Sequence, residues 1–135
     1  MPATPGRDSH RTIEDRTMRK RIASFRYAFE GLSVMLRTQP NAWIHAVATA
    51  LVVALGLRLG LDRQEWMAVV LAIGMVWVAE GLNTAIEFLA DAAVPDPHHL
   101  IRHAKDVAAG AVLLASVAAA VLGALVFLPH LGWLH

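Results

Sequence analysis

Hydrophobic residues in this chain gather into three segments, and each segment is long enough to cross a lipid bilayer. The segments cover residues 42–61, 66–90 and 106–128, with few charged residues inside them. A helix needs about 20 apolar residues to cross a hydrocarbon core of roughly 30 Å. We therefore predict an all-α membrane protein with three transmembrane helices.

A further helix is predicted over residues 18–39, where the hydrophobic residues recur at every third or fourth position. These residues are Met18, Ile22, Phe25, Phe29, Leu32 and Leu36. Arginines and lysines lie between them, a pattern typical of a helix at the interface of a membrane with anionic lipids. A helix that packs against the protein's own transmembrane bundle would have the same pattern. Residues 1–17 are polar, so we expect a disordered tail before a single domain of residues 18–135.

Local signals predict where these helices begin and end. Pro40 disfavours helical backbone at Gln39 and so separates the first helix from the next one. Asp62 and Glu65 have the spacing of a capping box, which predicts that another helix begins just before Trp66. Both signals agree with the boundaries of the hydrophobic segments.

The second transmembrane segment carries polar residues near its end, where lipid would make them costly. These residues are Glu80, Asn83, Thr84, Glu87 and Asp91. At about 100° per residue they fall on one side of the helix, and apolar residues such as Leu82 and Leu89 take the other side. Ionisable groups in a spanning helix are expected to face a protein interior or a wet cavity, and by default they mark a functional site.

The distribution of charge predicts the orientation of the protein in the membrane. The chain has 12 lysines and arginines, and eight of them precede Asn41. Positively charged segments stay on the cytoplasmic side, so we expect the N-terminus and the Asp91 end of the polar stripe to face the cytoplasm. The chain contains no cysteine, which excludes disulfide bonds and thiolate chemistry.

The third hydrophobic segment has small residues at every fourth position. They are Ala111, Ala115, Ala119 and Gly123. Small side chains at this spacing let helices approach closely. Because three helices alone hardly shield so polar a stripe, we expect a homo-oligomer. The alternative is that alanine is simply common in this segment.

Two motifs connect the polar stripe to a known family. Residues 80–91 read EGLNTAIEFLAD, and residues 103–115 read HAKDVAAGAVLLA. Together they resemble the hallmark E-x-x-N-[ST]-A-I-E-x-x-x-D followed by A-K-D of the bacterial membrane-embedded lipid kinases, the family of diacylglycerol kinase and undecaprenol kinase. The resemblance extends from about residue 20 to residue 128. It implies a homotrimer in the bacterial inner membrane, with active sites formed between subunits.

The resemblance also implies an activity, the transfer of a phosphoryl group from ATP to a lipid alcohol with the help of Mg²⁺. The sequence NAWIH at residues 41–45 and the sequence AKDVAAGAVLLA at residues 104–115 are more similar to the undecaprenol kinase branch. Undecaprenol is therefore favoured as the substrate, and diacylglycerol comes next. The chain has no phosphate loop of the G-x-x-x-x-G-K-[ST] kind, so ATP use rests on the resemblance. No nucleic-acid partner is expected.

By the same resemblance, individual residues receive roles. Glu80 matches the general base, and Glu87 matches a ligand of the metal. Gln39 stands where the family has a second metal-binding glutamate, so it offers a carbonyl oxygen without the charge. Asn83 would orient the base or a phosphate. The residues that match the family's ATP contacts are Lys20, Tyr27, Asn83, Glu87, Asp91, Asp96, His98, Lys105 and Asp106.

Several of these residues have a second interpretation that involves no chemistry. Glu87 and Asp91 could be solvated residues at the end of a helix. Lys105 and Asp106 could form an ordinary charged pair at the membrane boundary. His45 is interpreted as an interfacial or packed histidine rather than as a ligand.

Two other functional classes also fit a membrane protein with this stripe. A small oligomeric transporter or proton-coupled exporter could use Glu80 and Glu87 as a relay. A catalytically degenerate membrane adaptor is the third interpretation, and Gln39 lends it some support. The kinase interpretation is favoured because the acidic residues crowd one half of the membrane and meet Lys105 and Asp106 there.

Overall fold

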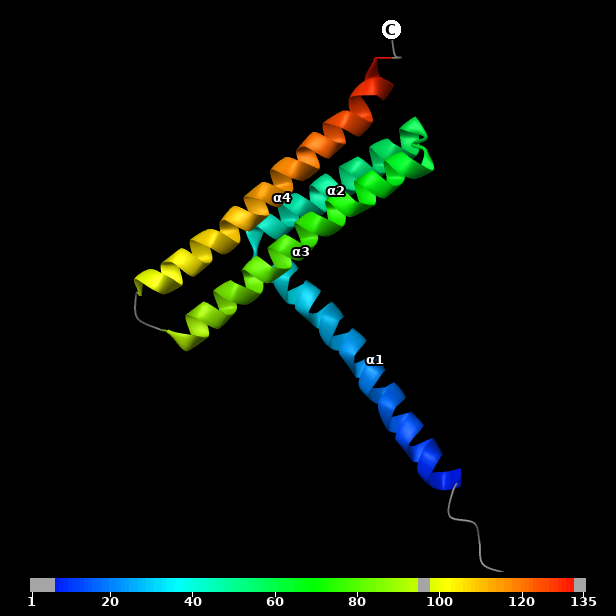
Figure 1. Ribbon diagram of the computed structural model, residues 1–135, viewed down its shortest axis with the longest axis vertical. Helices are drawn as coiled ribbons and strands as arrows, with labels where there is room; N and C mark the ends of the chain where they lie inside the picture. Colours follow the sequence, from blue (N-terminus) through cyan, green and yellow to red (C-terminus); the bar gives the residue numbers. More distant parts are fainter. Residues whose placement is uncertain (1–6, 95–97, 133–135) are drawn as a thin grey trace, which may run out of the picture. The chain divides into compact units, whose positions relative to one another are not determined.

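The computed structural model describes residues 7–94 and 98–132, and within these ranges it consists of four α-helices (Figure 1). They are α1 (Arg7–Thr38), α2 (Pro40–Leu59), α3 (Arg63–Ala93) and α4 (His99–Leu131). The chain divides into two compact units, Met1–Arg37 and Thr38–His135. The first unit contains nearly all of α1, and the second contains α2, α3 and α4. The predicted all-α class is confirmed.

The first helix, α1, is 32 residues long and begins at Arg7, before the predicted start at residue 18. Residues 7–17, which we expected to form a disordered tail, are therefore helical. No glycine or proline occurs between Arg7 and Glu30, so this polar stretch is compatible with a helix. Several apolar residues of α1 are exposed in the single chain, and Phe25 and Phe29 are each 69% exposed. A position at the membrane interface stays a prediction for this helix.

The backbone between α1 and α2 is extended at a single residue. Gln39 has φ −108° and ψ 113°, and Pro40 is the first residue of α2. Proline is tolerated in the first turn of a helix, but its ring disfavours helical backbone at the residue before it. The predicted break at Gln39 is confirmed.

The turn between α2 and α3 is tight because a glycine caps α2. Gly60 adopts the left-handed conformation, with φ 69°, so α2 ends at Leu59 and not at residue 61 as predicted. Leu61 then turns back toward the helices and is only 7% exposed. A β-carbon at Gly56 would lie 3.0 Å from both Leu61 Cδ1 and Trp66 Cη2, so the close packing at this turn depends on that glycine as well.

The third helix, α3, begins with the predicted capping box. The Asp62 carboxylate accepts a hydrogen bond from the backbone N–H of Glu65 at 2.9 Å, and the Glu65 carboxylate accepts one from the backbone N–H of Asp62 at 2.8 Å. These bonds satisfy N–H groups that have no partner within the helix. The predicted helix start is confirmed, with Arg63 as the first helical residue.

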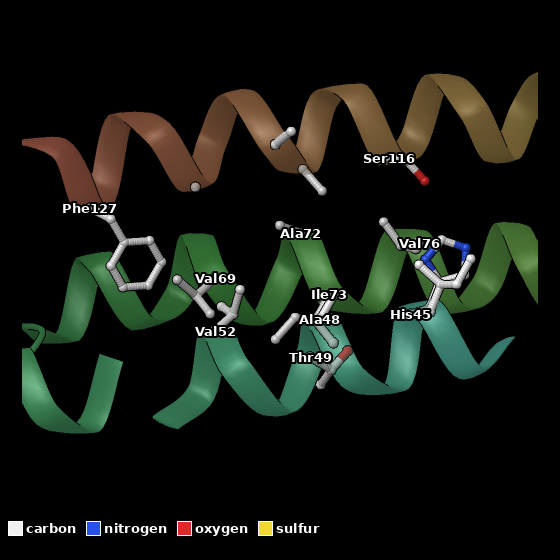
Figure 2. A pocket seen from close by; sticks show the side chains of 14 residues that line it. His45, Ala48, Thr49, Val52, Val69, Ala72, Ile73, Val76, Ser116 and Phe127 are labelled. Atoms are coloured by element: carbon white, nitrogen blue, oxygen red, sulfur yellow. The ribbon is translucent and has the colours of Figure 1, made fainter. Parts of the chain in front are cut away.

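The helices α2, α3 and α4 are each long and apolar enough to cross a membrane. Within the second unit, α3 lies between the other two helices and packs along α4 more extensively than along α2 (Figure 2). Both α3 and α4 continue past the predicted segments 66–90 and 106–128, because the polar residues at their ends are compatible with helix. Leu71 and Leu114, which are 70% and 73% exposed, are available to lipid.

The predicted row of small residues on α4 faces α3 only in part. Ala115 is buried, Ala119 and Gly123 are half-buried, and Ala111 is exposed. A helix has 3.6 residues per turn, so a row with a spacing of four drifts by about 40° at each step. The buried face of α4 therefore passes through Ala108 and Val112 and leaves Ala111 outside.

Gly60→Ala should destabilise the protein by about 1 kcal/mol, because a β-carbon in the left-handed conformation crowds the following carbonyl oxygen. Reversible unfolding in mixed detergent micelles measures the loss. Gly74→Ala in α3 is the matched control, since nothing lies within 4 Å of the β-carbon position there and alanine favours a helix. Equal stability of Gly60→Ala and the unmodified protein would show that this turn does not depend on glycine.

Candidate active site

The polar stripe of α3 faces the interior of the second unit, as predicted. Glu80 is 1% exposed, and Asn83 and Thr84 are each 5% exposed. Glu87 is half-buried, and Asp91 at the end of the stripe is exposed. On the opposite side of the helix, apolar side chains such as Leu82 and Leu89 are exposed, at 61% and 70%. The stripe thus runs from a buried carboxylate to a solvated one.

A pocket of about 270 Å³ lies beside the buried part of this stripe, between α2, α3 and α4. Its polar lining comes from all three helices, namely from Asn41, His45, Glu80, Asn83, Glu87 and Ser116. The remaining lining residues are aliphatic. The pocket therefore has both polar and aliphatic lining residues.

The carboxylate of Glu80 has no hydrogen-bond partner for either oxygen among the described residues. The hydroxyl of Thr84 donates to the backbone carbonyl of Glu80 at 2.9 Å, and not to its side chain. His45 Nε2 lies 3.8 Å from Glu80 Oε2, which is too far for a hydrogen bond. A buried acceptor without a partner costs roughly 1–3 kcal/mol, and more when it is charged. A group that donates a hydrogen bond from outside the chain would remove this cost.

The carboxylate of Glu87 is held by two amides. Gln39 Nε2 donates to Glu87 Oε2 at 2.9 Å, and Asn83 Nδ2 donates to Glu87 Oε1 at 3.2 Å. The first of these bonds connects the start of α2 to α3. Gln39, which the resemblance matches to a metal-binding position, therefore lies directly beside the expected metal ligand Glu87. Asn83 Oδ1 is buried and unpartnered among the described residues.

This arrangement suits a divalent cation only if the side-chain amides of Gln39 and Asn83 rotate so that their oxygens replace their nitrogens. Which amide atom is oxygen and which is nitrogen depends on the hydrogen-bond assignment, and a half-turn of Gln39 or Asn83 would direct a carbonyl oxygen at Glu87. One carboxylate and two carbonyl oxygens are hard ligands of the kind that Mg²⁺ accepts beside water and phosphate. No group of three or more His, Cys, Asp or Glu residues in the described part of the chain could hold a metal ion alone. The residues fit a metal that arrives with a phosphate ligand.

The exposed end of the stripe contacts the start of α4. Lys105 Nζ forms a short ion pair with Asp91 Oδ1, and so links the two helices on either side of the loop. Asp106 lies 3.9 Å from Arg102 on the same helix, with both side chains largely exposed. His98 caps α4, and its Nδ1 accepts a hydrogen bond from the backbone N–H of Leu100 at 3.3 Å. These side chains are partly or largely exposed, so a soluble ligand has access to them.

Three other expected ATP contacts belong to the first unit or fall outside the described residues. Tyr27 belongs to the first unit, is 60% exposed, and has the guanidinium of Arg26 5.3 Å from its ring centre. Lys20 lies in α1, but its side chain is outside the described part of the structure. Asp96 also lies outside the described residues.

His45 is one of the site residues that sequence reasoning missed. We interpreted it as a packed or interfacial histidine, but it lines the pocket beside Glu80. A signal was present, because Asn41 and His45 are four residues apart and so form a polar pair on one face of α2. Ser116 on α4 was missed as well, and no spacing in α4 distinguishes it.

Comparisons with known proteins identify the family of this chain. The family described as prokaryotic diacylglycerol kinase matches residues 26–127. The chain is 41% identical to the undecaprenol kinase of Bacillus subtilis over 108 residues, which cover 80% of this chain and 88% of that protein. It is 40% identical to the diacylglycerol kinase of Synechocystis over 111 residues, which cover 82% of this chain and 63% of that protein. The diacylglycerol kinase of Escherichia coli K12 is 27% identical over 106 residues, which cover 78% and 87% of the two chains.

The fold defines the class of this protein. It is a membrane protein with three helices that can span the bilayer and with a pocket lined by buried or half-buried acidic residues. Within that class, the chain belongs to the prokaryotic diacylglycerol kinase family, and it is a lipid kinase. The predicted resemblance is confirmed.

Proposed function

We propose that the protein transfers the γ-phosphoryl group of ATP to the hydroxyl group of a membrane lipid alcohol. The observation that carries this proposal is the buried carboxylate of Glu80, whose two oxygens have no partner among the described residues. Undecaprenol is favoured and diacylglycerol comes next. The match to the undecaprenol kinase of Bacillus subtilis, 41% identical over 88% of that protein, supports undecaprenol, and the 40% identity to the diacylglycerol kinase of Synechocystis keeps diacylglycerol as the next candidate.

Glu80 is proposed as the general base. The hydroxyl of the lipid donates to Glu80, and its proton passes to the carboxylate as the hydroxyl oxygen bonds to the γ-phosphorus. The bond from the γ-phosphorus to the bridging oxygen breaks on the opposite side, and ADP leaves. Burial suits this role, because a water-filled site would offer water in place of the lipid as the acceptor.

Glu87 and Gln39 are proposed to hold Mg²⁺ together with the phosphates of ATP. When bound, the metal neutralises charge on the transferred group. Asn83 lies one turn from both Glu80 and Glu87, and it already donates to Glu87 at 3.2 Å. We assign Asn83 the task of orienting the base or a phosphate oxygen.

The exposed residues at the polar boundary are proposed to bind the nucleotide. Lys105 offers a positive charge to a phosphate, and Asp91 holds that charge in place through the ion pair. The other residues proposed to contact ATP are Lys20, Tyr27, Asp96, His98 and Asp106. Their assignment rests on the match to the family's motifs.

The proposed setting is the bacterial inner membrane, with the N-terminus in the cytoplasm and three chains in the assembly. The excess of lysine and arginine before Asn41 supports the orientation. Only 11% of the most hydrophobic 18-residue stretch of α2 is buried within the single chain. The rest of this stretch is available to lipid or to other copies of the chain. A proton relay is less well supported, because the stripe covers only one half of α3 and reaches from Glu80 to Asp91.

Glu80→Gln should lower lipid phosphorylation by about a hundredfold or more, because the amide cannot accept the proton. The change is nearly isosteric, so binding of a fluorescent ATP analogue should remain. Purified protein in detergent, offered undecaprenol and diacylglycerol in parallel, provides the measurement, with Glu30→Gln in α1 as the matched control. Product from Glu80→Gln at the normal rate would refute the base. No product from the unmodified protein with either lipid would refute the kinase proposal and favour a degenerate adaptor.

Gln39→Glu should tighten divalent-cation binding in the presence of a non-hydrolysable ATP analogue by roughly tenfold, because a charged oxygen replaces a neutral one. Binding of Mn²⁺, followed by electron paramagnetic resonance, measures this without turnover. Gln64→Glu, at the exposed start of α3, is the matched control and should leave the affinity unchanged. Unchanged affinity in Gln39→Glu would place the cation elsewhere.

A further inference from the structure

The polar pocket continues into an apolar groove of about 450 Å³ along the same three helices. The two cavities share Ile44, His45 and Ser116. Figure 2 shows His45 and Ser116 at one end of the groove and Phe127 at the other. The eleven helical steps from Ser116 to Phe127 span about 16 Å along α4. The groove therefore leads from the buried carboxylate into the hydrocarbon region.

The lining of the groove is almost free of unpaired polar groups. Between its ends, Figure 2 shows mainly aliphatic side chains, namely Ala48, Val52, Val69, Ala72, Ile73 and Val76. The hydroxyl of Thr49 accepts a hydrogen bond from Trp77 Nε1 at 3.0 Å. A hydrocarbon chain fits such a lining, and a polar group attached to that chain would have its partners only at the His45 end.

His45 lies at this junction with its ring nitrogen near the base. Its side chain is 15% exposed, and Nε2 is 3.8 Å from Glu80 Oε2. No hydrogen bond of His45 is found among the described residues. Its ring nitrogens are therefore available to a bound ligand. A single oxygen atom can lie within about 2.8 Å of both groups, because that distance exceeds half of their separation.

We propose that His45 binds the oxygen atom of the lipid hydroxyl, and that the hydrocarbon chain of the lipid lies in the groove. The proposal rests on the proposed function and adds a substrate contact to it. His45 Nε2–H donates to the hydroxyl oxygen, and the hydroxyl donates to Glu80. Two fixed partners leave one lone pair of the oxygen free to attack the γ-phosphorus. His45 keeps its proton throughout, and the proton of the alcohol goes to Glu80.

The chemistry of this contact explains why a histidine serves here. The ring is rigid, so its N–H direction is set by packing, and little side-chain entropy is lost when the alcohol binds. The imidazole N–H donates a hydrogen bond without accepting the proton of the alcohol, so Glu80 remains the group that accepts that proton. A simple aliphatic residue would fill the space but would leave the alcohol with one partner.

The test compares His45→Leu with His45→Gln in the full-length protein, with kcat and KM measured separately for the lipid and for ATP. Glutamine can place an N–H close to the position of Nε2, and leucine cannot. We expect His45→Leu to lose at least tenfold in kcat/KM for the lipid, as for one lost hydrogen bond, and His45→Gln to recover most of it. The KM for ATP should stay unchanged in both. His103→Leu, an exposed histidine of α4, is the matched control.

The outcomes separate this inference from the proposed function. Full activity in His45→Leu, or an equal loss in His45→Leu and His45→Gln, overturns the contact while the kinase activity stands. A rise in the KM for ATP overturns it too, because the contact is made to the lipid alone. If the unmodified protein phosphorylates no lipid, the proposed function itself fails.

The occupant of the groove is tested in the same assay with Ala48→Phe, which narrows the groove without touching the polar pocket. We expect a higher KM for the lipid. The number of subunits, measured by light scattering of the detergent complex, should stay unchanged. A changed number of subunits with an unchanged KM for the lipid would show that a second copy of the chain fills the groove, and would refute this part of the proposal.

Discussion

A carboxylate placed in the apolar part of a spanning helix is the constraint on which the rest of this structure depends. Glu80 is 1% exposed, and the hydrocarbon interior of a bilayer offers it no hydrogen bond. The polar side of α3 must therefore turn toward α2 and α4, and this requirement explains why α3 is the central helix. It also explains why polar groups of three helices converge on one pocket. Among the described residues, both oxygens of Glu80 still have no hydrogen-bond partner, and this determines what the pocket can bind.

Gln39 lies beside this pocket, where it contacts Glu87, and it changes the local balance of charge. A glutamate there would add a third carboxylate near Glu80 and Glu87, and like charges repel strongly where water is scarce. The neutral amide avoids that repulsion and donates a hydrogen bond to Glu87 at 2.9 Å. The same amide attracts a cation less than a carboxylate does. Without a metal, the side chains of this pocket therefore repel one another less than they would with a glutamate at position 39. The pocket also attracts a metal less strongly.

Hydrophobic spacing predicted the spanning helices and the buried side of α3, because both follow from the helical repeat and the thickness of a bilayer. Hydrophobic spacing could not predict which residues contact one another across different helices. Gln39 and Glu87 are 48 positions apart, and only the motif match, not the local pattern, related them. The pairing of His45 with Glu80 was missed for the same reason. The early start of α1 was missed because a polar helix and a disordered tail have similar compositions.

The tight turn at Gly60 also fixes how α2 and α3 are aligned along their length. His45 lies fifteen residues before Gly60, and Glu80 lies eighteen residues after Asp62, which is about 22 Å and 27 Å along the two helices. Each added residue would shift a side chain by about 1.5 Å and rotate it by about 100°. A deletion or insertion in either arm would therefore separate the two groups, even if every remaining residue were kept. The lengths of these arms are as much a part of the site as its side chains.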